Sequence, residues 1–236
     1  LQHAFDGNLI LDEVNTSFQQ DKFSVLLGKN GSGKSTFFNL ISGLIPYRSG
    51  SISYFGKELR TMRYAKRAQL LGFLPQQHKP VFPFSVFDVL LTGRAAHSFL
   101  KPSATDIACV ERVLQELEIE NLKYKAYTDL SGGQKQLVMI GRILVQNPRV
   151  IILDEPTNHL DIYHQTHLMA VLKNLSRQGY TILAIMHDPN LAFLHADDIF
   201  FMQHKKIINQ VNIFDDEENT FLKSIYNVDM DTLNYR

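Results

Sequence analysis

The 236-residue sequence contains a single cysteine, Cys109, and its positive and negative charges cancel. With one thiol, no disulfide can form within the chain, so a reducing compartment is expected. The 24 basic residues (Lys and Arg) balance 24 acidic ones (Asp and Glu). A protein that binds nucleic acid nonspecifically normally carries a basic excess, so this balance argues against that class.

Long apolar runs are also lacking. No stretch approaches the ~20 residues that a membrane span requires, and the first residues lack the basic-then-apolar pattern of a secretory leader. No repeat, low-complexity tract or Gly/Ser-rich linker interrupts the sequence. We therefore expect one continuous globular unit in the cytoplasm. If the protein serves a membrane process, separate partners must supply the membrane part.

Short apolar runs alternate with amphipathic stretches along most of the chain. These patterns predict strands at 23–27, 70–74, 150–153, 181–185 and 199–202, and a β-hairpin that begins at 51–55. They predict helices at 35–41, 106–117, 133–145 and 161–175. Buried strands that alternate with helices are typical of a mostly parallel sheet covered on both faces. The stretch from about 80 to 130 lacks strands, and we interpret it as a helical subdomain inserted into an α/β core of about 1–79 and 131–236.

The segment Gly28-Lys29-Asn30-Gly31-Ser32-Gly33-Lys34-Ser35 has the complete spacing of a P-loop and lies between a predicted strand and a predicted helix. Its glycines let backbone N–H groups point at phosphate oxygens, and the helix directs a positive end of roughly +0.5 charge at the same anion. Lys34 would pair with the β- and γ-phosphates, and the Ser35 hydroxyl would ligate Mg²⁺. The predicted phosphate-binding residues are Gly28, Asn30, Gly31, Ser32, Gly33, Lys34, Ser35 and Thr36.

Two carboxylates, Asp154 and Glu155, follow the predicted strand 150–153. This places them at the carboxyl edge of the sheet, where α/β proteins bind ligands. Asp154 would hold Mg²⁺, directly or through water, and Glu155 would orient or deprotonate an attacking water. In isolation, a solvated acidic pair at a strand end would be the better interpretation. Beside Pro156-Thr157 and the P-loop, the pair instead favours hydrolysis of a nucleoside triphosphate.

A second anion site is predicted where Leu130-Ser131-Gly132-Gly133-Gln134 opens the helix 133–145. Its backbone N–H groups, the helix dipole and the Ser131 hydroxyl can together hold a phosphate. The sequence offers this site no phosphate-binding partner nearby. We therefore interpret the segment as a lid over the nucleotide of another copy of the chain.

Together, the three segments resemble those of the ATP-binding cassette family, from about Phe5 to the end of the chain. The resemblance implies a RecA-like P-loop ATPase fold, with a mostly parallel core sheet, an N-terminal antiparallel β patch and the helical subdomain. It implies ATP and Mg²⁺ as cofactors and a head-to-tail dimer. In that dimer each P-loop is covered by the other chain's Ser131, Gly132, Gly133 and Gln134. Asn158-His159-Leu160-Asp161 resembles the loop that crosses the dimer interface, which adds Asp161 to the nucleotide-binding set.

Three more residues are assigned through the resemblance. His187 matches a histidine that contacts the γ-phosphate, and Gln76 matches a glutamine that touches Mg²⁺ and the attacking water, although Gln77 is adjacent. Phe5 matches an aromatic residue that stacks on adenine, with a core aromatic on an N-terminal strand as an equally good interpretation. The expected catalytic set is Glu155, His187, Gln76 and Lys34. The expected metal ligands are Ser35, Gln76 and Asp154.

The segment 86–94 with His97, and the tail 221–228, resemble the metal-chelate and cobalamin importers. This implies an ATPase subunit at the cytoplasmic face of the inner or plasma membrane, bound to two permease subunits and served indirectly by a substrate-binding protein. The cargo would be a metal chelate, a cobalamin-like compound or a metal oxyanion. Phe82 and Phe84 are expected to contact the permease, whereas Phe87 packs internally. The alternative is a soluble cassette ATPase acting on ribosomes or DNA. The single motif set and the short interval from 35 to 130 argue against it, and no nucleic-acid partner is expected.

Overall fold

The computed structural model describes residues 1–5, 7–76, 83–97 and 101–209. Gln77, Phe82 and the tail 221–228 lie outside the described residues. The strands are β1 (His3–Phe5), β2 (Asn8–Leu11), β3 (Phe23–Leu27), β4 (Ser53–Tyr54), β5 (Lys57–Glu58), β6 (Leu71–Leu74), β7 (Val150–Asp154), β8 (Thr181–Ile185), β9 (Asp198–Gln203) and β10 (Lys206–Asn209). The α-helices are α1 (Lys34–Ile41), α2 (Tyr64–Leu70), α3 (Val86–Leu91), α4 (Ala104–Glu116), α5 (Gly132–Val145), α6 (Ile162–Arg177) and α7 (Pro189–His195).

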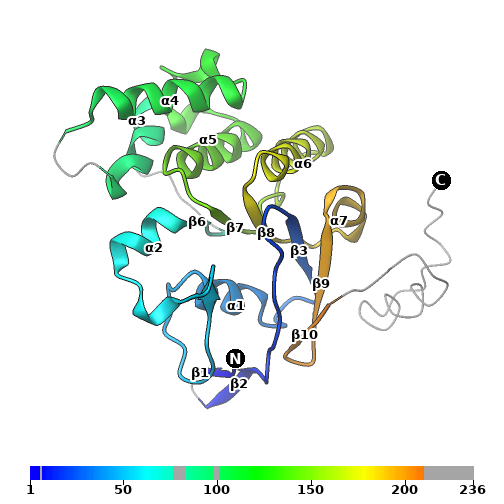
Figure 1. Ribbon diagram of the computed structural model, residues 1–236. Coiled ribbons are helices and arrows are strands. Elements are labelled where there is room, and N and C mark those ends of the chain that lie inside the picture. Colours follow the sequence, from blue (N-terminus) through cyan, green and yellow to red (C-terminus); the bar gives the residue numbers. More distant parts are fainter. Residues whose placement is uncertain (6, 77–82, 98–100, 210–236) are drawn as a thin grey trace.

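Six strands form the central sheet in the order β10-β9-β3-β8-β7-β6 (Figure 1). All neighbouring strands run parallel except β10, which pairs antiparallel with β9. Every residue of β3, β7 and β8 is buried. Continuous burial is expected of parallel strands covered by helices on both faces, so the predicted fold class is confirmed.

Alternate residues of the strands supply two separate apolar cores. Val25 and Leu27 pack into one cluster with residues of α5 and α6. Leu26 faces the other way and packs with Phe38 of α1 and Ile152 of β7. The helices α5 and α6 therefore cover one face of the sheet, and α1 covers the other.

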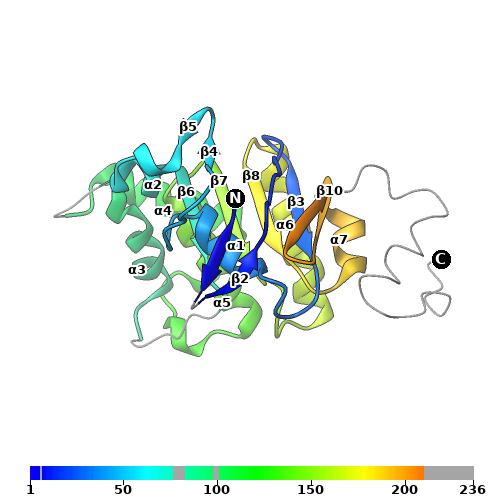
Figure 2. The same cartoon turned by 90° about the horizontal axis from the view of Figure 1, so that it is seen from below.

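The remaining elements are distributed at the two ends of the sheet. Figure 2 shows α3 and α4 gathered beyond β6, while α7 lies with β9 and β10 toward the opposite end. The antiparallel pair β1–β2 lies beside α1, where Ile10 approaches Gly33. In the described residues between 83 and 130 the chain forms helices, with one isolated bridge between Ser85 and Ala126.

Two helices of the structure were not predicted. No residue of α2 is buried. A helix without a buried face needs no apolar periodicity, which is the main sequence signal for a helix, so α2 was not predicted. The start of α7 does carry a signal, because Asp188 caps the helix and Pro189 occupies its first turn. The predicted hairpin is present as β4 and β5, but its paired residues are 53–54 and 57–58 and its strands are shorter than expected.

Candidate nucleotide site

The loop between β3 and α1 is fitted closely against β9. A Cβ atom at Gly28 would lie 2.6 Å from the carbonyl oxygen of Met202, so a larger residue cannot replace this glycine without moving backbone. Gly33 is the N-cap of α1 and offers no side chain to bond the first N–H groups of that helix. The buried hydroxyl of Ser32 has no hydrogen-bond partner among the described residues. A phosphate fits this loop, because its oxygens would satisfy such donors.

Lys34 lies inside the loop and is only 5% exposed. Its Nζ donates to the carbonyl oxygens of Gly28 at 2.6 Å and Lys29 at 3.0 Å. Burial lowers the pKa of Lys34, and the nearby carboxylates of Glu155 and Asp154 oppose that shift. A buried ammonium group held by two neutral carbonyls is suited to an incoming anion.

Ser35 and Asp154 meet across the sheet edge. The Ser35 hydroxyl donates to Oδ1 of Asp154 at 3.2 Å, although 119 positions separate the two residues. Burial raises the pKa of Asp154, while the bond from Ser35 opposes the shift. A hydroxyl and one carboxylate fit Mg²⁺, which prefers oxygen ligands and usually needs only one or two carboxylates beside phosphates and water.

Glu155 lies one residue beyond Asp154 in a left-handed backbone conformation, with φ of 55°. Its side chain is 8% exposed, and Nε2 of His187 lies 2.6 Å from Oε1. Nε2 of Gln76 and Nδ2 of Asn158 both donate to Oε2.

These contacts bring Gln76, Glu155 and His187 together at one sheet edge. The three residues follow β6, β7 and β8, which are adjacent parallel strands. The sequence placed Glu155 at this edge, and Gln76 and His187 were assigned through the family resemblance. In the structure both Gln76 and His187 contact Glu155. The sequence did not predict that Asn158 would join them.

Ser131, Gly132, Gly133 and Gln134 lie in a second cluster, at the start of α5. Ser131 is the N-cap: its hydroxyl accepts from the N–H of Gln134 at 3.3 Å, and its own N–H donates to Oε1 of Gln134 at 3.1 Å. Within the described part of the chain, no hydrogen bond joins these four residues to the P-loop. Within one chain, the two predicted anion sites are therefore not joined by hydrogen bonds among the described residues.

The second cluster also contains the start of α6. Asp161 caps this helix by accepting from the N–H of His164 at 2.9 Å, and its carboxylate lies 2.8 Å from Nδ1 of the same residue. The His164 ring faces α5: a Cβ atom at Gly133 would lie 2.0 Å from its Cδ2. Gly133 is therefore required by packing inside one chain, a reason that the sequence did not reveal.

The other predicted residues range from exposed to half-buried. Phe5 on β1 is 66% exposed, so it is not a core aromatic. Asn30 and Gly31 are exposed and Thr36 is half-buried. Phe84 is 56% exposed, whereas Phe87 packs against the core as predicted.

Arg94 has a structural role in this fold. It forms an ion pair with Asp106 at 2.6 Å and donates from Nη1 to the carbonyl oxygen of Val145 at 3.0 Å. His97 approaches the adjacent carbonyl, that of Gln146, at 2.8 Å. These groups cap the carboxyl end of α5, where a positive charge is favoured.

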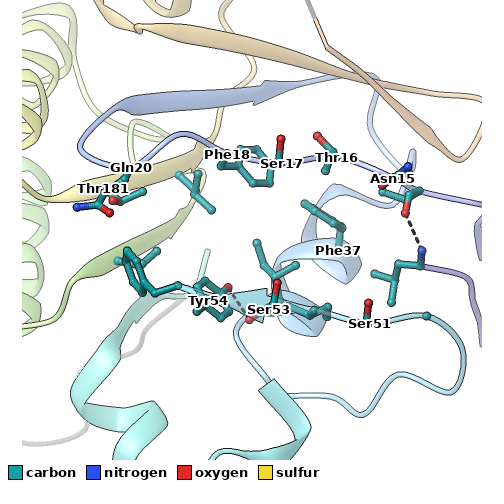
Figure 3. Close-up of a pocket in the computed structure, with 18 of the residues that line it drawn as sticks. Asn15, Thr16, Ser17, Phe18, Gln20, Phe37, Ser51, Ser53, Tyr54 and Thr181 are labelled. Atoms are coloured by element: carbon teal, nitrogen blue, oxygen red, sulfur yellow. Dashed lines mark hydrogen bonds between the residues drawn. The ribbon is translucent and has the colours of Figure 1, made fainter. Parts of the chain in front are cut away.

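A cavity of about 870 Å³ opens at the opposite edge of the sheet (Figure 3). It lies between segments 13–20 and 50–55, beside the starts of β7 and β8. Phe18, Phe37 and Tyr54 contribute to its lining. Because the parallel strands begin here and end at the P-loop, this cavity is separate from the phosphate-binding edge.

A P-loop and the groups that follow three neighbouring parallel strands define the class of P-loop nucleoside triphosphatases. A family model described as "ABC transporter" matches residues 11–158, and the chain belongs to that family. The domain shared by the family binds ATP.

Relatives and solved structures agree with this assignment. The chain is 34% identical over 209 residues to a hemin import ATP-binding protein of Gloeobacter violaceus, covering 86% of this chain and 76% of the relative. A metal-chelate type ABC transporter in an inward-facing conformation aligns with a TM-score of 0.80 at 29% identity, covering 92% of this chain and 82% of that one. A dimeric bacterial ABC transporter cassette, MJ0796, aligns with a TM-score of 0.74 at 25% identity over 87% of this chain and 92% of the cassette.

Among the helices that the structure describes, none combines the length and apolar character needed to cross a bilayer.

Proposed function

We propose that this chain is the ATP-hydrolysing subunit of an importer for a metal chelate such as an iron–porphyrin compound. The observation that carries the proposal is the meeting of Lys34, Ser35, Asp154 and Glu155 at one sheet edge. The import assignment and the cargo class draw on the relative named for hemin import and the solved metal-chelate transporter. The proposed cargo classes also include a cobalamin-like compound and a metal oxyanion.

The residues would divide the chemistry in a simple way. The P-loop N–H groups and Lys34 bind the phosphates, with Gly28, Gly31 and Gly33 shaping the loop and Asn30, Ser32 and Thr36 lining it. Bound Mg²⁺ would neutralise charge on the β- and γ-phosphates, and Ser35, Asp154 and Gln76 are its proposed ligands. Phe5 is the proposed adenine-stacking residue, which its exposure permits.

Glu155 is the proposed base. Its carboxylate would orient the attacking water and accept a proton from it. His187 contacts Oε1 of Glu155 and would contact the γ-phosphate of bound ATP. Phosphoryl transfer depends mainly on positioning and on stabilising charge, so these groups would form the catalytic core of the site.

A second copy of the chain would complete each site. The start of α5 presents Ser131, Gly132 and Gln134 at the surface, with Gly133 buried beside His164, and the loop before α6 presents Asp161. Among the described residues, no hydrogen bond joins the start of α5 to the chain's own P-loop. We propose that these groups cover the nucleotide of the partner in a head-to-tail dimer. The dimeric cassette MJ0796 supports the arrangement by similarity.

The membrane partners are also part of the proposal. Two permease subunits would hold the dimer at the cytoplasmic face of the membrane, with exposed Phe84 in their contact, and would receive cargo from a substrate-binding protein. Residues from about 80 to 130 are the proposed helical subdomain that transmits the motion, between core segments of about 1–79 and 131–236.

Replacement of Glu155 by glutamine tests the hydrolytic assignment. The variant should retain ATP binding and lose at least about nine-tenths of the ATPase rate, because the amide cannot accept the proton. With ATP it should form a stable dimer, since the closed state no longer resolves by hydrolysis. Steady-state ATPase assays and size-exclusion chromatography with ATP give both readouts, and retained turnover would refute the assignment of the base.

Affinity purification tests the import assignment against the alternative of a soluble cassette acting on ribosomes or DNA. The chain should co-purify with polytopic membrane proteins after mild detergent extraction. Recovery with ribosomes or DNA instead would favour the alternative.

A further inference from the structure

The residues Glu155-Pro156-Thr157-Asn158 form a tight turn directly after β7. The N–H of Asn158 donates to the carbonyl oxygen of Glu155 at 3.2 Å, which is the bond between the first and fourth residues of a β-turn. Proline occupies the second position, where its fixed φ favours turn formation. The turn also joins the side chains at its two ends, because Nδ2 of Asn158 donates to Oε2 of Glu155.

The Glu155 carboxylate is therefore held on both oxygens. His187 contacts Oε1, and Gln76 and Asn158 donate to Oε2. Gln76 is an exposed residue, whereas Asn158 is half-buried and lies in the same turn as the carboxylate. The contact from Asn158 is thus local in sequence, because Asn158 and Glu155 are the two ends of the same four-residue turn.

The turn is itself anchored to the next helix. Thr157 is 5% exposed, and its carbonyl oxygen accepts from the N–H of Leu160 at 3.3 Å. The same oxygen accepts from Nε2 of Gln165 on α6 at 3.3 Å. With β7 on one side and α6 on the other, the backbone fixes where the Asn158 amide lies relative to Glu155.

The surrounding charges explain why an amide suits this position. Glu155 lies near the ammonium group of Lys34 and the carboxylate of Asp154, and both interact with it electrostatically. A neutral amide donates a hydrogen bond without adding charge. An aspartate would place a second carboxylate against Glu155, which is destabilising.

We propose that Asn158 is a positioning residue for Glu155, whose amide holds the carboxylate in the orientation in which it meets the attacking water. The inference rests on the proposed function, since it assigns Asn158 to the same hydrolytic site. Asn158 acts through Glu155 and needs no contact of its own with the nucleotide.

The test compares Asn158→Asp with the double variant Glu155→Gln/Asn158→Asp. Asn158→Asp should lower kcat about tenfold or more while KM for ATP changes less than about threefold, because the P-loop contacts are untouched. It should also lower Tm by about 3–6 °C through carboxylate repulsion. The double variant exchanges donor and acceptor, so it should restore most of the lost Tm and yet remain inactive.

Asn174→Asp is the matched control. Asn174 is exposed on α6, and the substitution adds the same charge away from the site, so kcat and Tm should stay near wild type. Circular dichroism verifies that each variant is folded.

Unchanged kcat in Asn158→Asp would overturn the proposal, as would a Tm loss that the exchanged pair does not recover. A wild-type chain without ATPase activity would refute the proposed function directly. The Tm comparison would still show whether the two side chains interact, so the two failures are distinguishable.

Discussion

Two helices of this protein begin at predicted phosphate-binding segments, and they begin in different ways. The start of α1 has a glycine cap without a side chain and a buried lysine in its first turn. The start of α5 has a serine cap, and Ser131 and Gln134 satisfy each other's backbone N–H groups. The start of α1 therefore holds a positive charge that can pair with an anion. The start of α5 carries no charged side chain in its cap, and its capping groups bond to each other.

This difference distinguishes two roles: binding the phosphate of a nucleotide, and covering a nucleotide that is already bound. A site with its own lysine can bind phosphate within one chain, because the charge-assisted contact offsets the cost of desolvating the ligand. A site with only backbone N–H groups and a hydroxyl depends on a ligand that is already anchored elsewhere. The P-loop should therefore determine affinity for nucleotide, and the start of α5 should determine whether the bound nucleotide is covered.

The largest expected effect comes from removing the charge at the first site. Lys34→Ala should weaken ATP binding by about 10- to 150-fold, the equivalent of a charged hydrogen bond worth about 1.5–3 kcal/mol. Ser131→Arg should leave ATP binding by the single chain intact and abolish ATPase activity, since the added side chain blocks the partner's nucleotide. Isothermal titration and ATPase assays distinguish the two outcomes.

Mixing the two variants sharpens this test. In a mixed dimer one composite site carries both lesions and the other carries neither, so partial activity should return. If mixed dimers form and remain inactive, the two helix starts do not share a nucleotide.

An intermediate effect is expected at Gly133. A Cβ atom there would lie 2.0 Å from Cδ2 and 2.9 Å from Cβ of His164, so the ring cannot avoid it by rotating alone. Gly133→Ala should reduce the free energy of unfolding by about 1–3 kcal/mol. The matched control is Gly132→Ala, whose Cβ would have no neighbour nearer than 3.9 Å and should cost nothing. Equal unfolding midpoints in urea for both variants would show that Gly133 is not fixed by packing.

The smallest expected effect concerns the self-bonded start of α5. Gln134→Ala removes one half of the reciprocal capping bonds and should lower the free energy of unfolding by about 0.5–1 kcal/mol. Gln136→Ala makes the same change two residues further along α5, where no capping bond is lost. Thermal unfolding should separate the two variants by about 1–4 °C, and a difference of zero would mean that the capping bonds add nothing in solution.

The sequence was sufficient where the information is local. The apolar runs of β3, β7 and β8 predicted continuous buried strands, and the positions of Asp154 and Glu155 at the end of one such run predicted their place at the carboxyl edge of the sheet. Strand burial and strand ends follow from a few consecutive residues, so both could be derived without the fold.

Contacts between separate elements could not be derived in the same way. The closeness of Gly133 to His164 depends on how α5 and α6 pack, which no spacing rule specifies. The contact of Asn158 with Glu155 was within reach, because Glu-Pro-Thr-Asn is a turn sequence. The hydrogen bond between the two side chains was not predicted, because residues 158–161 were interpreted only as a loop at the dimer interface.

The order of strands in the sheet also has a consequence for how the protein is made. β3 is synthesised early, yet both of its neighbours, β8 and β9, come from the last quarter of the sequence. Until those strands leave the ribosome, the four apolar core residues and the two open edges of β3 lack their partner strands. Such non-local pairing is slow and prone to aggregation. We expect the nascent chain to depend on chaperones through most of its synthesis, and protease digestion of chains stalled before Thr181 is the direct check. The proposed ATP site, at the end of β3, would then form among the last parts of the molecule.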